Sequence, residues 1–332
     1  MNKNNEGCAV RLGLVNIFYL VLAIIFGFTT VFDSMNLTLL TGESKKKIVL
    51  GSYFINSFIS TYKPDANNFN VFSQKLVDRI NEKKVYFNAP KGSFGTDQKV
   101  LFEGDQGILN KEKSNLVISD NVTLLTDGMK TTSRNLSVNF QKNSAVAIGN
   151  VKSNIVEGLR KVSIRAQKLF VEDAQKELKY IGLVNGEIKG RDKQAFSNIS
   201  FKSDLLTYNH DDKIIFLEGN AFINRAKSQI SGLRGNIWLN NQTSRVKYFS
   251  MSDDVKLRDE FVNTHGEIIK RNSFSEKVEG FSDEEKLILS GFPQVEQEGD
   301  IIKGNQMIIR EDQEMIEIIN TNSQFRLKNR ND

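Results

Sequence analysis

Residues 205–249 read LLTYNHDDKIIFLEGNAFINRAKSQISGLRGNIWLNNQTSRVKYF. Short apolar runs alternate here with turns rich in Gly, Asn and Asp, which is typical of antiparallel strands rather than helices. The runs share one layout: a polar turn, about five strand residues, then Gly or a small polar residue that ends the run. IIFLEG ends in this way at Gly219, and RVKYFS ends at Ser250.

The same layout extends in both directions along the chain. KVLFEG ends at Gly104, LVISD at Asp120, ELKYIG at Gly182, KLILSG at Gly291 and MIEIIN at Asn320. Beyond Asp120 most of these terminators are about 30 to 40 residues apart, which is a repeat signal. Only 72–80 has an ambiguous pattern that also fits a short helix. We therefore predict an all-β chain beyond about residue 50.

Alignment of the runs on their terminators separates two faces. The residues two and four places before the terminator are all apolar or aromatic, whereas those one and three places before it are mixed. Since successive strand side chains point to opposite faces, the first set is predicted to form one inner wall. Its members are Val100, Phe102, Leu116, Ile118, Leu178, Tyr180, Ile215, Leu217, Val246, Tyr248, Leu287, Leu289, Ile316 and Ile318.

One copy departs from the pattern, and the pattern itself has two interpretations. AVAIG, ending at Gly149, places Ala145 and Ala147 inside and the larger Val146 and Ile148 outside. The inner wall fits the core of an ordinary β-sandwich as well as the lining of a groove for lipid, and periodicity alone does not distinguish them. It does favour one continuous sheet system with a single apolar face.

A membrane segment is predicted at 12–33, after a short N-terminal tail at 1–11. Residues 12–32 read LGLVNIFYLVLAIIFGFTTVF without a charge, and about 20 apolar residues span a bilayer as a helix. No small-residue cleavage pattern follows, which favours an uncleaved signal anchor. Lys3 and Arg11 precede the segment and Lys45–Lys47 follow it, so the charge count does not itself place the N-terminus in the cytoplasm.

Composition offers little support for catalysis or nucleic-acid binding. The 45 basic and 40 acidic side chains give a net charge of +5 and are spread along the chain, without a basic stripe interleaved with aromatics. The single cysteine, Cys8, excludes an internal disulfide. The two histidines, His210 and His265, stand in polar stretches without the spacing of metal ligands. We therefore expect no enzyme, no cofactor and no metal.

The order of these motifs resembles the lipopolysaccharide-transport bridge proteins, the LptA/LptC (OstA-like) family. The family's pattern is a strand ending in Gly-Asn, an apolar strand, a polar hairpin, then Ile-x-Gly-Asp/Asn. Gly219-Asn220 fills the first place, and Ile230-Ser231-Gly232 or Gly235-Asn236 the second. A later copy ends with Ile302-Lys303-Gly304-Asn305, and Gly149-Asn150 opens an earlier one. The resemblance covers most of the chain beyond residue 50.

The resemblance implies a twisted β-jellyroll, one extended or two tandem, with lipid acyl chains held between two sheets. Residues 50–150 resemble the anchored LptC component, and 151–332 an appended LptA/OstA-like unit. The chain would then lie in the inner membrane as a single-pass protein with its bulk in the periplasm. It would carry lipopolysaccharide from the inner-membrane ABC transporter complex toward the outer membrane, and nucleic acid is not an expected partner.

Family members also join end to end by adding edge strands, so the resemblance implies docking edges at both ends of the sheet. The first would contain Ile55, Phe58 and Tyr62 and dock on the transporter; the last would contain Ile316, Ile318 and Phe325 and dock on an LptA-like bridge protein. Two alternatives remain: a membrane-tethered structural or adhesive β-repeat protein with a dry core, and, with least support, a hydrolase on a β scaffold.

Overall fold

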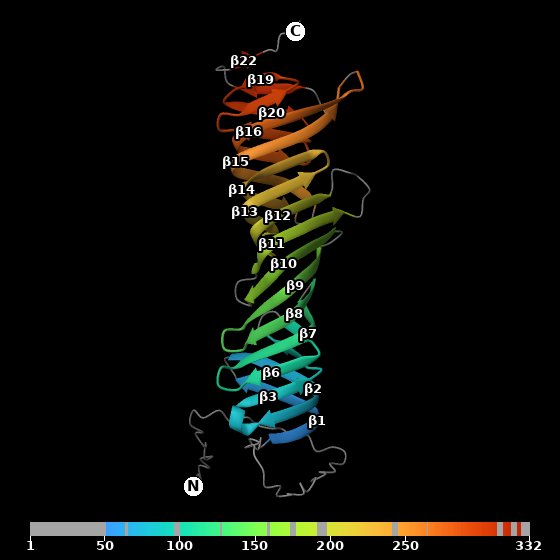
Figure 1. Cartoon of the computed structure of the whole chain (residues 1–332), viewed down its shortest axis with the longest axis vertical. Coiled ribbons are helices and arrows are strands. Elements are labelled where there is room, and N and C mark those ends of the chain that lie inside the picture. The colour runs from blue at the N-terminus through green and yellow to red at the C-terminus, as the bar shows by residue number, and fades with distance from the viewer. Residues whose placement is uncertain are drawn as a thin grey trace, which may run out of the picture. The chain divides into compact units, whose positions relative to one another are not determined.

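The chain folds as an antiparallel β protein in a computed structural model. The structure describes residues 51–326 except 64–65, 96–99, 127, 158–159, 173–176, 191–197, 241–244, 264, 311–314 and 320–323. The described strands number 22 and belong to one hydrogen-bonded sheet. The all-β prediction is thus confirmed, and Figure 1 shows the strands following one another in chain order along the unit.

The first six strands and a single 3-10 turn form one end of the sheet. Of the stretch that fitted a short helix, residues 72–79 belong to β2, and Ile80 begins the 3-10 turn η1 (Ile80–Glu82). The strands are β1 (Gly51–Lys63), β2 (Ala66–Arg79), β3 (Lys84–Asn88), β4 (Lys91–Phe94), β5 (Val100–Glu103) and β6 (Gln106–Asn110).

The middle of the sheet consists of long strands joined by hairpins, each paired with the strands before and after it. They are β7 (Asn115–Thr126), β8 (Met129–Asn139), β9 (Ser144–Glu157), β10 (Arg160–Glu172), β11 (Glu177–Gly190), β12 (Ile199–Asn209), β13 (Ile214–Arg225), β14 (Ser228–Leu239), β15 (Val246–Val262) and β16 (Ile268–Phe281).

Short strands form the other end: β17 (Lys286–Ser290), β18 (Gln294–Gln297), β19 (Asp300–Lys303), β20 (Gln306–Arg310), β21 (Ile316–Ile319) and β22 (Gln324–Arg326). β16 pairs with β17 along one half and with β18 along the other. The sheet therefore divides here into two branches, β17–β20–β21 and β18–β19–β22.

Each long odd-numbered strand contains a corner made of two consecutive residues with positive φ. The corner residues are Asp120–Asn121, Gly149–Asn150, Gly182–Leu183, Gly219–Asn220 and Asp253–Asp254, and Gly291–Phe292 repeats the geometry between β17 and β18. Positive φ favours Gly and Asn because these residues meet the smallest steric penalty there. Strand pairing skips the corner residues, as in a β-bulge. The repeated Gly-Asn of the sequence is thus the device that folds each strand.

The corners divide the long strands into two walls. Each long odd-numbered strand is divided in two by its corner. The halves before the corners, together with the neighbouring strand halves that pair with them, form what we call the first wall. The halves after the corners, with the strand halves that pair with them, form the second wall. Figure 1 shows strand segments in front and behind along the unit. Inward side chains of both walls belong to one contiguous hydrophobic cluster from Phe69 to Ile309. The predicted jellyroll layout of two facing sheet layers therefore describes this unit.

The sheet is continuous across residue 150, where the sequence suggested a boundary between two units. Residue 150 lies inside β9, and β9 pairs with both β8 and β10 over its length. Residues 50–332 also form one compact unit. Of the two arrangements left open, one extended structure is the one observed.

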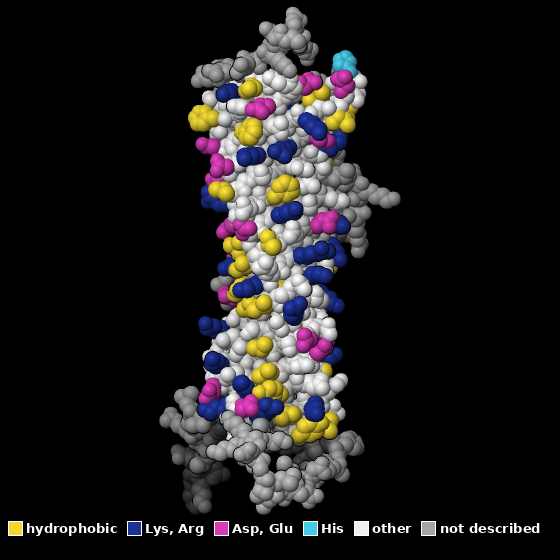
Figure 2. All heavy atoms as spheres, in the orientation of Figure 1, with side chains coloured by type: hydrophobic (Ala, Val, Ile, Leu, Met, Phe, Trp, Pro, Cys, Tyr) yellow, Lys and Arg dark blue, Asp and Glu magenta, His cyan; other side chains and the backbone are white. Residues whose placement is uncertain are grey.

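The predicted signal anchor at 12–33 lies outside the described residues. Within the described part, no helix combines the length and the apolar character needed to cross a bilayer. Figure 2 shows Lys and Arg side chains dispersed along one face with Asp and Glu among them, as the mixed charge of the sequence indicated.

Candidate functional site

Two rows of inward side chains run along the first wall, and their residues are paired from strand to strand. We call them row I and row II. Row I joins Leu116, Val138, Ala145, Val171, Leu178, Tyr208, Ile215, Ile237, Phe249, Gly280, Leu287, Ile309 and Ile316.

Row II lies two residues nearer the corners. It joins Ile118, Leu136, Ala147, Leu169, Tyr180, Leu206, Leu217, Gly235, Met251, Val278, Leu289, Met307 and Ile318. No member of either row carries a charge. Together they form an uninterrupted apolar track from β7 to β21.

Most of the predicted inner-wall residues lie where the alternation placed them. Val100, Phe102 and Val246 are buried, though outside the two rows, and Leu178, Ile316 and Ile318 are half-buried against the cluster. The AVAIG copy also follows the prediction, since Ala145 and Ala147 are buried and Ile148 is exposed.

The inward position predicted for Tyr248 is wrong. Tyr248 pairs with Trp238, is half-buried, and donates a hydrogen bond to Glu279. Its neighbours Phe249 and Met251 are fully buried and occupy rows I and II. The prediction aligned this run on Ser250, whereas the corner of β15 is Asp253–Asp254. Counted back two and four places from Asp253, the rule gives Met251 and Phe249.

The interior is closed by its own side chains in this structure. Tyr180, Leu217 and Leu289 expose 0 to 1 % of their surface. Burial raises the pKa of Tyr180, whose hydroxyl lies 3.7 Å from the Met129 Sδ atom. These rows therefore line a packed interior, and acyl chains would enter it only if side chains or walls moved apart.

The second wall also has an inward row, which we call row III, and it is partly charged. Arg225 exposes 2 % of its surface, Asp259 5 % and Arg271 none. Arg271 donates hydrogen bonds from Nε and Nη2 to the Asp259 carboxylate. This row was not predicted from the sequence, although strand alternation indicates it. Arg225 stands two residues after the buried Ile223 in β13 and therefore points to the same face.

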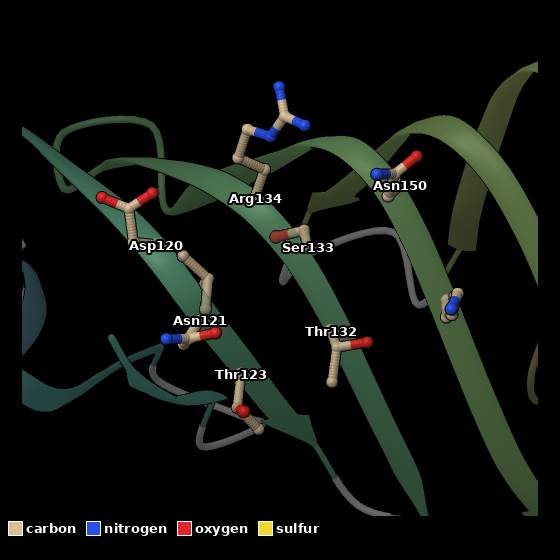
Figure 3. Close-up of a pocket in the computed structure, with 9 residues that line it drawn as sticks. Asp120, Asn121, Thr123, Thr132, Ser133, Arg134 and Asn150 are labelled. Carbon is tan, nitrogen blue, oxygen red and sulfur yellow. The ribbon is translucent and has the colours of Figure 1, made fainter. Parts of the chain in front are cut away.

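A separate polar pocket lies at the corner of β7–β9, with a volume of about 540 Å³. Figure 3 shows Asp120, Asn121 and Thr123 on one strand, Thr132, Ser133 and Arg134 on the next, and Asn150 beyond. Hydroxyl, amide and charged groups line this pocket, so it suits a polar molecule and not an acyl chain.

The predicted docking edges are unpaired among the described strands. β1 pairs only with β2, while β21 pairs only with β20 and β22 only with β19. Ile55 and Phe58 on β1 expose 66 % and 59 % of their surface. The side chains of Tyr62 and Phe325 lie outside the described residues. Apolar side chains on an open edge are what strand addition would use, but a docking partner remains a prediction.

Residues 102–245 match the model of the family described as LptA/(LptD N-terminal domain) LPS transport protein. The resemblance found in the sequence is thereby confirmed over this LptA-like region, which is less than half of the 332 residues. It contains the corners from Asp120 to Gly219 and most of rows I and II. No curated protein matches the chain significantly.

One solved structure similar to the chain is described as LptH, the LptA homologous periplasmic component of the conserved lipopolysaccharide transport device from Pseudomonas aeruginosa. It shares 8 % sequence identity, and the match covers 42 % of this chain and 100 % of that one, with a TM-score of 0.36. The LptA-like region is therefore assigned on the family match and the repeated corners, and not on this superposition.

Proposed function

We propose that this protein is an inner-membrane-anchored, periplasmic component of lipopolysaccharide export. It would carry the lipid along rows I and II, from an inner-membrane ABC transporter complex toward the outer membrane. The observation that carries this proposal is the uninterrupted apolar track of the two rows, together with the LptA-like match over 102–245. The anchor rests on the apolar run at 12–33. No catalytic role is proposed.

The energetics suit a passive carrier. Burying an acyl chain is worth about 0.8 kcal/mol per CH₂ group, so a dozen buried groups contribute on the order of 10 kcal/mol. Because the rows present similar apolar walls on successive strands, a lipid could shift along them at little net cost. Work to load the track would come from the ATPase of the transporter.

The open edges support end-to-end assembly in the same proposal. β1, with exposed Tyr53, Ile55 and Phe58, would dock on the transporter, and β21 or β22 on an LptA-like bridge protein. Adding a strand satisfies the unpaired backbone groups of both partners.

A second candidate function is favoured by the closed interior. A membrane-tethered structural or adhesive β-repeat protein needs only a dry core, and the 0 to 1 % exposure of Tyr180, Leu217 and Leu289 fits such a core. The two candidates differ in whether lipid ever reaches these side chains.

Site-specific photo-crosslinking in cells separates them. A photoreactive residue at Tyr180 or Leu217 is expected to capture lipopolysaccharide, while one at the exposed Lys179 or Lys247 is not. Equal capture at the inward and outward positions would refute the proposed track. Absence of capture at every inward position, in protein that remains folded, would favour the dry-core function.

A further inference from the structure

The outer face of the second wall carries a row of side chains beside the corners, which we call row IV. Its members are exposed or half-buried and are paired from strand to strand between β7 and β18. They are Thr123, Thr132, Lys152, Arg165, Asn185, Lys202, Phe222, Ser231, Lys256, Phe274 and Gln294. The row contains cations and no carboxylate. Because its members come from successive strands, the row is not visible in the linear sequence.

The positive charge is densest from β9 to β12, where like charges stand opposite each other. Lys152 on β9 is the direct partner of Arg165 on β10, and Lys161 is the partner of Lys189. Lys189 lies 3.0 Å from the Glu187 carboxylate, whereas the described part of the chain offers no ion pair to the other three cations. Like charges in directly opposed positions destabilise a sheet. Solvation alone does not favour this arrangement, so it points to an anionic partner.

The polar pocket at the corner of β7–β9 opens onto the start of this row. Thr123, Thr132 and Lys152 belong both to row IV and to the lining of the pocket, as Figure 3 shows for the two threonines. Arg134 also lines it, and a Cβ atom at the corner residue Gly149 would stand 3.2 Å from the Arg134 Cβ atom. Glycine at this corner therefore leaves room for the arginine stem. The pocket and the cations of row IV form one continuous surface.

The lining of the pocket combines charge with neutral hydrogen-bonding groups. Arg134 and Lys152 are its cations, and Asp120 is the one carboxylate among the lining residues. The hydroxyl groups come from Thr123, Thr132 and Ser133, and the amide groups from Asn121 and Asn150. Hydroxyl and amide groups both donate and accept hydrogen bonds, which is what the hydroxyl groups of a sugar require.

We propose that this surface binds an anionic saccharide. Its carboxylate or phosphate groups lie on Lys152, Arg165 and Lys202, and its hydroxyl groups lie in the pocket. Lysine and arginine hold such oxygens through charge-assisted hydrogen bonds, which are stronger than neutral ones. The surface lies outside the walls and rows I and II lie between them, so this inference goes beyond the proposed carrier function and does not depend on it.

The spacing of the cations sets the size of the ligand. Neighbouring strands lie about 4.8 Å apart, so Arg165 is one strand and Lys202 three strands, about 14 Å, from Lys152. A single sugar or an inorganic ion cannot contact all three, whereas a chain of several sugars can. A flat bilayer surface fits less well, because the pocket is concave and row IV has no apolar side chain from β7 to β12.

The test compares charged and neutral chains of equal length. Calorimetry on the full-length protein in detergent measures the binding of tetragalacturonate, which has a carboxylate on every sugar, of uncharged maltotetraose, and of tetraglutamate, a peptide with the same acidic groups. Wild type is expected to bind tetragalacturonate about tenfold or more tightly than either of the others, the strength of a charged hydrogen bond. Added salt should weaken this binding, because it screens exposed charges.

Three variants locate the binding. Lys152→Gln/Arg165→Gln is expected to lower the affinity for tetragalacturonate by about tenfold or more. Lys247→Gln/Arg258→Gln removes the same charge from exposed positions of β15 and should leave the affinity unchanged. Thr132→Val removes one hydroxyl group of the pocket and should weaken the binding of tetragalacturonate but not that of tetraglutamate. Thermal unfolding checks the fold, and the first variant should be at least as stable as wild type because it removes a like-charge pair.

Two kinds of result overturn the proposal. If tetraglutamate binds as tightly as tetragalacturonate, the surface recognises charge alone and the assignment to a saccharide is wrong. If tetragalacturonate binds no better than maltotetraose, or if Lys152→Gln/Arg165→Gln behaves like the β15 variant, this surface is not a binding site.

Competition identifies the source of the saccharide. Displacement of tetragalacturonate by the lipid-free, phosphorylated core oligosaccharide of lipopolysaccharide supports the site and assigns it to the carried lipid. Binding of tetragalacturonate without such displacement supports the site and assigns it to another acidic glycan. Neither result bears on the carrier function, which crosslinking at Tyr180 and Leu217 tests separately.

Discussion

The ring of Phe249 lies against the backbone of Gly280, its partner across β15 and β16. A Cβ atom added at Gly280 would stand 2.0 Å from the Cζ atom of that ring. Phe201 lies on Gly186 in the same way, and a Cβ there would stand 2.0 Å from its Cε2 atom. The interior thus fits large rings by placing glycine on the neighbouring strand.

Replacing Gly280 by alanine is therefore expected to destabilise the protein. The added methyl group displaces Phe249, and overpacking of this kind costs about 1 to 3 kcal/mol. Chemical denaturation of the variant measures the loss. Asn272→Ala, on an exposed position of the same strand, is the control and should change stability little. The double variant Gly280→Ala/Phe249→Leu should recover part of the loss; failure to recover it would mean that the ring is not the obstacle.

The corners make a second prediction. Asn220 has a φ of 46°, and its Nδ2 atom donates a hydrogen bond of 2.8 Å to Asp204. Asn220→Val should lower stability by about 1 to 3 kcal/mol, because a β-branched residue is strained in the left-handed region. Asn220→Gly should cost less. Asn224→Val, in the regular part of β13, should leave stability unchanged or higher, and equal losses at both positions would contradict the corner geometry.

Acid should weaken the contact between Glu279 and Tyr248. Burial alone raises the pKa of Glu279, but hydrogen bonds from Lys277 and Tyr248 outweigh it and hold that pKa below the ordinary value of 4.5. A lowered pKa contributes stability that is complete above the ordinary value and is lost as pH falls through the lowered one. Glu279→Gln should therefore be less stable than wild type at neutral pH, with a difference that shrinks below about pH 4.5.

Thermal unfolding across this pH range measures the effect. Tyr248→Phe removes one donor and should narrow the acid-dependent difference, whereas Glu298→Gln, at an exposed position, should leave the profile unchanged. A difference between wild type and Glu279→Gln that persists undiminished in acid would show that the carboxylate charge is not its source.

Much of the fold could be predicted because alternation and turn chemistry are local. Gly219-Asn220 marks a corner in the sequence, since few residue pairs accept two consecutive positive φ values. In β15 the apolar run RVKYFS ends at Ser250, three residues before the corner Asp253–Asp254, so alignment on Ser250 assigns Tyr248 to the wrong face. The alternation itself is correct, but which residues it places inside depends on locating the corner residue of each strand.

The charged row could not be found by looking for apolar residues at inward positions. Arg225 and Arg271 occupy such positions by parity, yet an arginine in a strand is by default expected at the surface. Their burial depends on which strand halves face each other, which is a long-range property. For the same reason, the continuity of the sheet through residue 150 was visible only in the pairing of β9 with both neighbours.

The buried pair Asp259 and Arg271 gives a final prediction, and it bears on whether the interior is dry. Asp259→Ala leaves the Arg271 guanidinium buried without its carboxylate, which is expected to cost about 3 to 5 kcal/mol. Asp259→Leu/Arg271→Met should be close to wild type, because apolar residues of similar volume replace a buried pair without loss. Glu112→Ala, in an exposed pair with Lys83, should cost within about 1 kcal/mol.

The comparison of the two single variants decides how this region behaves in solution. A large loss for Asp259→Ala and a small one for Glu112→Ala would mean that water does not reach row III and that the interior near β15 and β16 is dry. If Asp259→Ala instead costs no more than Glu112→Ala, then water solvates Arg271 and the walls open spontaneously near β15 and β16. That outcome would favour the carrier function over the dry core, because lipid could enter where the walls open.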